Sequence, residues 1–351
     1  MMKTKDLKKG KYKASQKKTV FLTGIGGFIA SHTVEHIIKN TDWNIIGVDS
    51  FRHKGDPLRV TDIETFDPKR ITIHHADLSA PLGERLEARI GRPDYIISMA
   101  SESHVDRSIE YPVPFIQNNV NLVLNMLEFA RKVKPEIFIQ ISTDEVYGPA
   151  KPGQLHEEWS TILPSNPYSA SKAAQEAIAI SYWRTYGVPV VITNTMNNFG
   201  ERQDPEKFIP MVVKKIVQGE VVPIHGTPGK VGSRFYLHAR NHADALIFII
   251  KNLPPKKYGQ SGVDRPDRYN VVGEREINNL EMAQLIAKFL GKPLKYKLID
   301  FHSARPGHDL RYALDGLRMR DLGWIPPVPL EESLKKTVQW SIAPENKEWL
   351  V

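Results

Sequence analysis

The segment ISTDEVYG, residues 141–148, places a hydroxyl group and two carboxyl groups side by side after an apolar run typical of a buried strand. These residues are Thr143, Asp144 and Glu145. Adjacent carboxyl groups in a closed site push their pKa values apart, which suits one acid and one base. The same residues could instead cap the next helix or lie in a solvated turn, so a catalytic role requires partners elsewhere.

A tyrosine and a lysine four residues apart in NPYSASKAA are the first candidate partners. Tyr168 and Lys172 lie on one face of a helix predicted over residues 167–186. A free tyrosine has a pKa of about 10, and a nearby ammonium group stabilises its phenolate form. With Ser142 or Thr143 near the substrate hydroxyl, this set could take the proton of an alcohol while a hydride leaves the same carbon.

The glycine-rich segment TGIGGFIAS offers a site for the hydride acceptor. Gly24, Gly27 and Ala30 occupy the glycine positions of a dinucleotide-binding turn, where backbone and a helix N-terminus approach a pyrophosphate. Asp49 ends the second predicted strand, where a carboxylate accepts hydrogen bonds from the adenosine ribose and repels a 2′-phosphate. The pattern therefore favours NAD over NADP.

Three nearby residues qualify the cofactor prediction. Asp77 closes the third predicted strand and is expected beside the adenine, although a simple turn residue is the alternative. Arg52 and Lys54 follow Asp49 and keep NADP as an alternative, because either cation could accept a 2′-phosphate.

The elements that must position these residues alternate between apolar strand-like runs and amphipathic helical stretches. The runs are KTVFLTG, WNIIGVD, ITIHHAD, YIISMAS and IFIQIST, and helices are predicted over 29–39, 112–132 and 167–186. This alternation predicts an α/β protein with a Rossmann-type, doubly wound parallel sheet. Successive strand side chains point to opposite faces, so the strand must end or bend at Thr143 if the triplet shares one pocket.

The chain divides into three predicted regions. Residues 1–18 are expected to be a disordered basic tail, and residues 19–195 a Rossmann domain. Residues 196–351, which are richer in Pro and Gly at their start, are expected to form mainly a smaller substrate-binding lobe. A later strand and helix, at about 234–252, are expected to return to the first domain.

The net charge of +8 is concentrated in the tail, where eight lysines oppose one aspartate over residues 1–18. The body of the chain is therefore nearly neutral, which argues against a nucleic-acid partner. No apolar run approaches the roughly 20 residues that span a bilayer, and no signal-peptide core follows the basic start. We therefore expect a cytoplasmic protein. The absence of cysteine excludes disulfides and thiolate nucleophiles, and no metal site is predicted.

The chain resembles the extended short-chain dehydrogenases/reductases, and specifically the dTDP-glucose 4,6-dehydratase family. The matching segments are TGIGGFIAS, SESHVDRSI, ISTDEVYG, PSNPYSASKAA, RTYGVPVVITNTMNNFGERQDPEKFIP and RPGHDLRYALD. They follow the family's order over nearly the whole chain after the tail. The Thr-Asp-Glu triplet is the discriminating feature, because related epimerases and decarboxylases generally carry a different triplet there.

The resemblance implies a hydro-lyase that converts a nucleotide-glucose to its 4-keto-6-deoxy form through bound NAD. Tyr168 would act as base during oxidation at C4, and Thr143 would hydrogen-bond the C4 oxygen. Glu145 would then remove the C5 proton, and Asp144 would protonate the departing C6 hydroxyl. A homodimer through the helices at 112–132 and 167–186 is also implied.

The resemblance assigns further binding residues. For the cofactor they are Gly24, Gly27, Phe28, Ile29, Asp49, Asp77, Leu78, Tyr168 and Lys172. For the nucleotide sugar they are Ser103, Asn197, Glu206, Lys207, Phe208, Pro223, His225, Arg234, Asn270, Arg305 and His308. His104, Asp106 and Arg107 match the family too, and a structural network after the fourth strand is the alternative role for them.

Alternatives remain open for the substrate and for the function. His225 stands where thymidine-specific enzymes usually have a tyrosine, and the loop before Arg234 is about two residues longer than usual. The favoured substrate is dTDP-glucose, with UDP-glucose next. A nucleotide-sugar 4-epimerase would use the same Tyr168 and NAD without needing the acidic pair. A non-catalytic NAD-binding regulator is the third reading, against which the complete catalytic set counts.

Overall fold

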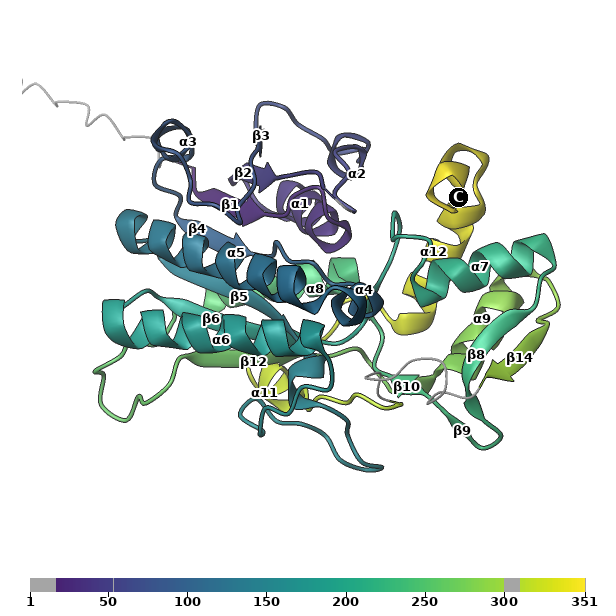
Figure 1. Cartoon of the computed structure of the whole chain (residues 1–351). Helices are drawn as coiled ribbons and strands as arrows, with labels where there is room; N and C mark the ends of the chain where they lie inside the picture. The colour runs from purple at the N-terminus through teal and green to yellow at the C-terminus, as the bar shows by residue number, and fades with distance from the viewer. Residues whose placement is uncertain (1–16, 53, 300–309, 351) are drawn as a thin grey trace, which may run out of the picture.

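A seven-stranded parallel sheet forms the centre of the molecule (Figure 1), with strand order β12-β6-β5-β4-β1-β2-β3. The computed structural model describes residues 17–52, 54–299 and 310–350. The strands are β1 (Thr19–Thr23), β2 (Asn44–Asp49), β3 (Ile71–His75), β4 (Tyr95–Ser98), β5 (Ile137–Thr143), β6 (Val190–Thr195) and β12 (Asp267–Val271).

Helices cover both faces of this sheet, and alternate residues of each strand point their side chains toward one helical layer or the other. Helices α1 (Phe28–Asn40) and α8 (Ala239–Asn252) pack together on one face, where Leu22 and Ile97 join their core. Helices α5 (Pro112–Val133) and α6 (Pro167–Tyr186) lie side by side on the other (Figure 1), where Phe21 and Ile96 point. Because successive side chains of a strand point to opposite faces, each strand contributes apolar residues to both cores. The predicted doubly wound α/β fold is confirmed.

A smaller lobe follows β6 and has a hydrophobic core of its own. Its main elements are α7 (Phe208–Gln218), β8 (Val222–Thr227), α9 (Asn279–Leu290), β14 (Tyr296–Ile299) and α12 (Leu330–Ile342). The shorter elements of the chain are α2 (Leu58–Thr61), α3 (Glu84–Ile90), α4 (Val105–Glu110), η1 (Asp144–Tyr147), β7 (Asn198–Phe199), β9 (Lys230–Val231), β10 (Ser233–Arg234), β11 (Leu237–His238), β13 (Ile277–Asn278), α11 (Leu317–Asp321) and η2 (Pro344–Leu350). Across the described ranges, no helix is both long enough and apolar enough to cross a membrane.

The element that returns to the central sheet differs in part from the prediction. Helix α8 does pack against α1, as expected for residues up to 252. The short strand β11, however, pairs with β7 in a separate two-stranded sheet, and the seventh central strand is β12. The sequence DRYNV of β12 does not look like a buried strand, because it begins with two charged residues. Asp267 and Arg268 are nevertheless only 3% and 1% exposed.

Arg268 can be buried because its charge and its faces are both covered. Its Nη2 donates to Glu176 Oε2 at 2.6 Å, and its guanidinium lies 4.2 Å from the centre of the Trp159 ring. Glu176 also accepts a hydrogen bond from Asn194 at 2.7 Å. A buried ion pair persists when its geometry is good and most of its remaining polar atoms are bonded. Arg268 Nη1 donates to the carbonyl of Glu158 at 2.9 Å, whereas Arg268 Nε has no partner among the described residues. This pair joins α6 to the edge strand β12.

Buried histidines give the fold an expected pH dependence. Burial lowers the pKa of His242, in α8, from 6.5 to about 4. In the window between these values the unfolded chain binds a proton that the folded chain does not, so stability rises with pH. His242→Leu should reduce the slope of unfolding free energy against pH by about 1.4 kcal/mol per unit in that window. Urea unfolding at several pH values measures the slope, and an unchanged slope would contradict the assignment.

Candidate active site

The acidic triplet lies where β5 stops and the single turn η1 begins. Thr143 is the last residue of the strand and also the N-cap of η1, with its Oγ1 accepting from Glu145 N at 3.3 Å. The same hydroxyl donates to Asp144 Oδ1 at 2.8 Å. The strand therefore ends at the residue where the sequence required it to end, and strand alternation no longer separates the three side chains.

The two carboxyl groups form a buried dyad with raised pKa values. Burial raises the pKa of Asp144 to about 6. Burial, together with the adjacent Asp144, raises the pKa of Glu145 to about 7. Between these two values the dyad holds about one proton, and the higher pKa of Glu145 places it more often on Glu145 when no substrate is bound. Asp144 Oδ2 is buried and has no hydrogen-bond partner among the described residues, so it can carry a proton without losing a bond.

Tyr168 lies at the start of α6, close to this dyad. Burial, together with the charges of Glu145 and Asp144, raises its pKa above the usual value, and hydrogen bonding with Thr143 acts in the opposite direction. The phenol is therefore protonated in the absence of a further cation. A catalytic phenolate needs positive charge beside it, which is the role the sequence predicts for Lys172.

Lys172 is fixed one turn further along α6. Its ammonium group donates to the carbonyl of Ile141 at 2.7 Å and to Oε1 of Gln175 at 2.6 Å. Burial lowers the pKa of Lys172 to about 8, while Glu176 opposes that change. Gln175 in turn donates to the carbonyl of Asn119 at 2.6 Å, so the lysine is held by a rigid, neutral acceptor. The ammonium is thus held on α6 by two neutral acceptors, Ile141 and Gln175.

Two cations from the smaller lobe reach the dyad. Arg234 and Lys207 both favour the ionised form of Glu145 and therefore oppose its raised pKa. Arg234 is anchored by donating from Nη1 to the carbonyl oxygens of Ser233 and Leu310. Lys207 caps α7, and burial lowers its pKa while Glu145 raises it. The structure thus brings both predicted substrate residues to the carboxyl pair.

The glycine turn between β1 and α1 has the geometry of a pyrophosphate cradle. Gly24 has a φ of +72°, and a Cβ there would lie 2.9 Å from the Cα of Ala100. Gly27 is the N-cap of α1 and provides no side-chain cap, so the N–H groups of Phe28 and Ile29 are open to an anion. Asp49 accepts from Gly26 N at 2.9 Å and from Phe51 N at 2.8 Å, which fixes its carboxylate beside the turn. These residues fit a dinucleotide.

Arg52 and Lys54, the two cations that could have bound the 2′-phosphate of NADP, both form ion pairs within the protein. Arg52 pairs with Asp77 at 2.9 Å, and Lys54 pairs with Asp204 at 3.1 Å and Glu206 at 3.0 Å. Asp77 also accepts from Ser79 N at 2.9 Å, and the next residue, Leu78, is buried. The arrangement agrees with the preference for NAD that Asp49 predicts.

A methyl group in the turn should release the cofactor. In Gly24→Ala the new Cβ meets Ala100, and the positive φ is strained for alanine. We expect the NAD content of purified protein to fall at least about tenfold, since roughly 1.4 kcal/mol of lost affinity suffices. Extraction of the cofactor and its quantification measure the loss. Gly83→Ala, where a Cβ meets nothing within 4 Å, is the matched control and should retain NAD.

The remaining predicted substrate residues lie in several places. Asn197 precedes β7, and its Oδ1 is buried with no partner among the described residues. Ser103 is exposed before α4, and Phe208 begins α7. Pro223 and His225 lie on β8 opposite β14. Arg305 and His308 lie outside the described residues.

Two of these predicted residues bind other parts of the chain. Asn270 is fully buried in β12 and donates from Nδ2 to the carbonyls of His156 at 2.9 Å and Asp315 at 3.1 Å. Its amide nitrogen therefore holds chain segments together. Glu206 pairs with His104 at 3.2 Å as well as with Lys54, so it lies at the rim of the site.

The residues after β4 form a network of their own. His104 is the N-cap of α4, accepting from Arg107 N at 3.4 Å. Arg107 lies 3.8 Å from Glu102, and Asp106 lies in the first turn of the same helix. This geometry supports the structural alternative stated for His104, Asp106 and Arg107.

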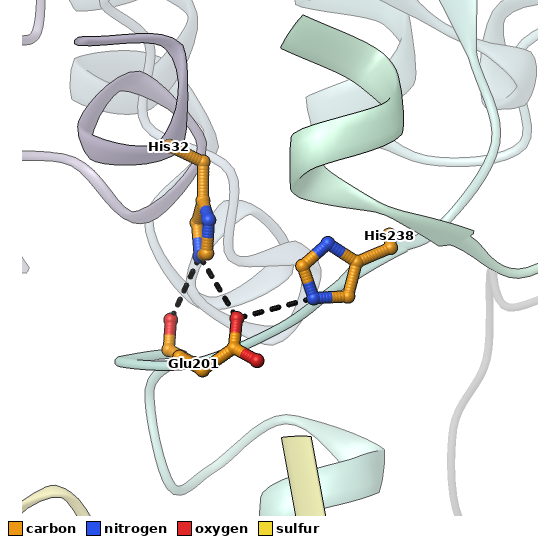
Figure 2. A group of neighbouring side chains, drawn as sticks. All are labelled: His32, Glu201 and His238. Atoms are coloured by element: carbon orange, nitrogen blue, oxygen red, sulfur yellow. Dashed lines mark hydrogen bonds and ion pairs between the residues drawn. The ribbon is translucent and has the colours of Figure 1, made fainter. Parts of the chain in front are cut away.

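One cluster has the composition of a metal site, namely His32, Glu201 and His238 (Figure 2). Its hydrogen bonds assign protons to both imidazole Nε2 atoms. His32 Nε2 lies 3.0 Å from the carbonyl oxygen of Glu201, which can only accept. His238 Nδ1 accepts from Arg240 N at 3.0 Å, so its Nε2 donates to Glu201 Oε2 at 3.1 Å. A metal needs free lone pairs on these nitrogens. The cluster is better described as a glutamate held by two imidazole donors, His238 at its carboxylate and His32 at its backbone carbonyl.

Sequence reasoning missed two polar residues that contact the catalytic groups. Gln175 holds Lys172, and Asn166 donates to Glu145 Oε2 at 3.3 Å. Asn166 had a usable signal, because it directly precedes Pro167 at a predicted helix start, where an N-cap is expected. Gln175 had none, since its role depends on Asn119 in a different helix.

Comparisons with known proteins show the family to which the chain belongs. The sequence profile of the NAD dependent epimerase/dehydratase family matches residues 20–271. A dTDP-glucose 4,6-dehydratase of Escherichia coli is 35% identical over 358 residues, covering 94% of each chain.

Solved structures of similar fold include members of the same family. A dTDP-glucose 4,6-dehydratase of Streptomyces venezuelae, solved with NAD and TYD bound, superposes with a TM-score of 0.82 at 31% identity, over 94% of this chain and 98% of that one. A UDP-glucose 4-epimerase of Thermus thermophilus, solved with NAD, gives 0.78 at 27% identity, over 92% and 98%. The chain therefore belongs to the NAD dependent epimerase/dehydratase family, together with the dTDP-glucose 4,6-dehydratases.

Proposed function

We propose that the protein is an NAD-dependent nucleotide-sugar 4,6-dehydratase that acts on an NDP-glucose. The observation that carries the proposal is the buried Asp144–Glu145 dyad beside Tyr168 at the end of β5. Oxidation of an alcohol by NAD needs the tyrosine and lysine as its only catalytic side chains. Elimination of water needs an additional base and an additional acid, and the dyad supplies both.

The chain's residues divide the reaction between them. Tyr168, stabilised by Lys172, takes the proton of the C4 hydroxyl, while Thr143 hydrogen-bonds the C4 oxygen. The resulting ketone acidifies C5, from which Glu145 removes the proton. Asp144 protonates the C6 hydroxyl, which leaves as water. The proton held by Glu145 is then available for return to C5.

The cofactor makes this sequence redox-neutral. When bound, NAD would accept a hydride from C4 and later supply one to C6. Gly24, Gly27 and Asp49 would hold it, and Tyr168 and Lys172 would lie at its reactive end. The net change is loss of one water from the hexose, giving the 4-keto-6-deoxy product.

A nucleotide-sugar 4-epimerase is the second candidate, favoured by the epimerase structures among the similar folds. It would require only inversion at C4, for which Tyr168 and NAD suffice. It would leave two adjacent buried carboxyl groups without a task, although burying them is costly. A non-catalytic regulator would likewise have no use for the complete set of Tyr168, Lys172 and the dyad.

The test is incubation of the purified protein with dTDP-glucose and with UDP-glucose separately. A dehydratase gives a product lighter by one water, whereas an epimerase gives a product of equal mass. dTDP-glucose is the favoured substrate by similarity to the curated relatives. UDP-glucose is second, because His225 occupies the position of the expected tyrosine. Equal-mass products, or none from either substrate, would contradict the proposal.

A homodimer is proposed through the outer face of α5 and α6. Val113 and Leu124 on α5 are 64% and 38% exposed, and Ala177 on α6 is exposed beside them. Closed symmetric pairs are the commonest use of such a self-complementary face. Leu124→Glu should shift the protein from dimer to monomer in sedimentation equilibrium. Leu322→Glu, at a similarly exposed leucine on the turn after α11, is the control and should stay dimeric.

The finer assignments of place and domain belong to the same proposal. We place the enzyme in the cytoplasm, where nucleotide sugars would be the substrates, and cell fractionation tests this. The division at residue 195 into a cofactor domain and a substrate lobe is likewise a proposal. It is supported by the separate hydrophobic core of the smaller lobe.

A further inference from the structure

The orientation of the Asn166 side chain is determined by the helix that it begins. Asn166 is the N-cap of α6, and its Oδ1 accepts from Ser169 N at 2.9 Å. The Ser169 hydroxyl completes a capping box by accepting from Asn166 N at 3.2 Å. Because the amide oxygen is committed to the helix, the amide nitrogen must point the other way.

That nitrogen meets the carboxyl group at the active site. Asn166 Nδ2 donates to Glu145 Oε2 at 3.3 Å, and Asn166 itself is buried. A donor aimed at a carboxyl oxygen stabilises the charged form and restricts its rotation. Tyr168, two residues after the cap, also interacts with Glu145. One side chain therefore connects the start of the catalytic helix with the proposed base.

The other groups that face Glu145 come from four elements. Asp144 on η1 opposes its ionisation, whereas Lys207 before α7 and Arg234 on β10 favour it. Tyr168 on α6 is neutral when protonated and is itself affected by the Glu145 charge. Asn166 is the donor that contacts Glu145 Oε2 from the helix of Tyr168 and Lys172. Its hydrogen bond lowers the pKa of Glu145, against burial and the charge of Asp144, and so shifts the shared proton toward Asp144.

We propose that Asn166 is a positioning residue for Glu145, orienting its carboxylate toward C5 and biasing the dyad so that Glu145 is the base. This inference rests on the proposed dehydratase function. It adds that the cap of α6 couples the geometry of oxidation at Tyr168 to that of elimination at Glu145.

Two substitutions separate the cap from the donor. Asn166→Ser and Asn166→Asp both keep an oxygen that can cap the helix, and both lose the N–H group. Asn166→Asp also places a second negative charge opposite Glu145. We expect Asn166→Ser to lower kcat about tenfold with KM for the nucleotide sugar unchanged, as for loss of one hydrogen bond to a charged group. For Asn166→Asp we expect the rising limb of the kcat–pH profile to move to higher pH by about one unit or more.

A direct titration supplies a readout other than turnover. The Glu145 carboxyl resonance, assigned in ¹³C-glutamate-labelled protein by its loss in Glu145→Gln, should titrate at higher pH in both Asn166 variants. The matched control is Asn278→Ser at the N-cap of α9, which accepts from Glu281 N at 2.9 Å and should leave both profiles unchanged.

The outcomes distinguish this inference from the function on which it rests. If the wild-type protein dehydrates neither sugar, the proposed function fails, and the titration still tests the contact. If it does dehydrate one of them, and the Asn166 variants keep its kcat–pH profile and the Glu145 titration, Asn166 is only a helix cap and the inference is overturned. A parallel change in Asn278→Ser would also overturn it, because loss of capping would then explain the effect.

Discussion

Glu145→Gln lowers formation of the 4-keto-6-deoxy product by a factor of about 10² to 10⁴, the range expected for loss of a general base. Oxidation at C4 should persist, because it depends on Tyr168, Lys172 and NAD. The bound nicotinamide should therefore accumulate in its reduced form on addition of substrate. Its near-ultraviolet absorbance and the mass of the sugar product, followed in one reaction, measure the two halves separately.

A stability measurement shows whether this variant is folded. The folded-state pKa of Glu145 is raised by burial, so its contribution to stability is present at low pH and is lost as pH rises through that value. Glutamine carries no charge to bury, and Glu145→Gln should unfold at the same or a higher temperature than wild type above neutral pH. A folded variant that turns over normally would make the carboxyl group structural, and elimination would need another base.

Asp144→Asn should resemble the glutamate variant, because Asp144 also acts after oxidation. Its Oδ2 is buried without a partner among the described residues, as a group reserved for a substrate hydroxyl would be. Reduced nicotinamide should again accumulate while product falls. A loss of the oxidation step instead would assign Asp144 to the C4 hydroxyl.

Local signals explain why much of the fold and site could be predicted from the sequence. The glycine turn, the end of β5 at Thr143 and the Tyr168–Lys172 spacing each depend on residues within one or two elements. The doubly wound sheet followed from apolar runs of the right length, since a strand buried on both faces cannot carry many polar residues. The predicted helix over 167–186 agrees with α6 at both ends because Asn166 and Pro167 begin it and Gly187 ends it in the left-handed region.

Long-range contacts explain what could not be predicted. Strand β12 has a polar sequence, and Arg268 within it can be buried only because Glu176 and Trp159, both distant in sequence, contact it. Gln175 is an ordinary helix residue until Asn119 and Lys172 are brought to either side of it. Periodicity reports which face of an element is buried, but it does not report which buried polar groups meet. Asn270 shows the converse, because a residue matched by resemblance holds backbone carbonyls together in this chain.

Tyr168→Phe should abolish both halves of the reaction, in contrast to the carboxyl variants. The substitution removes only the hydroxyl, and the ring can keep its edge contact with Phe115, whose centre lies 6.3 Å away. Without the phenol no group in the site takes the C4 proton, because Lys172 is held by Ile141 and Gln175. We expect neither reduced nicotinamide nor product, with the oxidation rate lowered by a factor of about 10² to 10⁴.

The order of the steps makes this comparison decisive. If oxidation precedes elimination, a protein without the Tyr168 hydroxyl never reaches the step that needs Glu145. The double variant Tyr168→Phe with Glu145→Gln should therefore have the same rates of nicotinamide reduction and product formation as Tyr168→Phe alone. Retained NAD, measured after denaturation, shows that the single variant still binds its cofactor. If Tyr168→Phe still reduced the nicotinamide, another group would be the C4 base. If Glu145→Gln blocked reduction as fully as Tyr168→Phe, the acidic pair would belong to the oxidation step, and simple epimerisation or oxidation would replace dehydration as the function of this site.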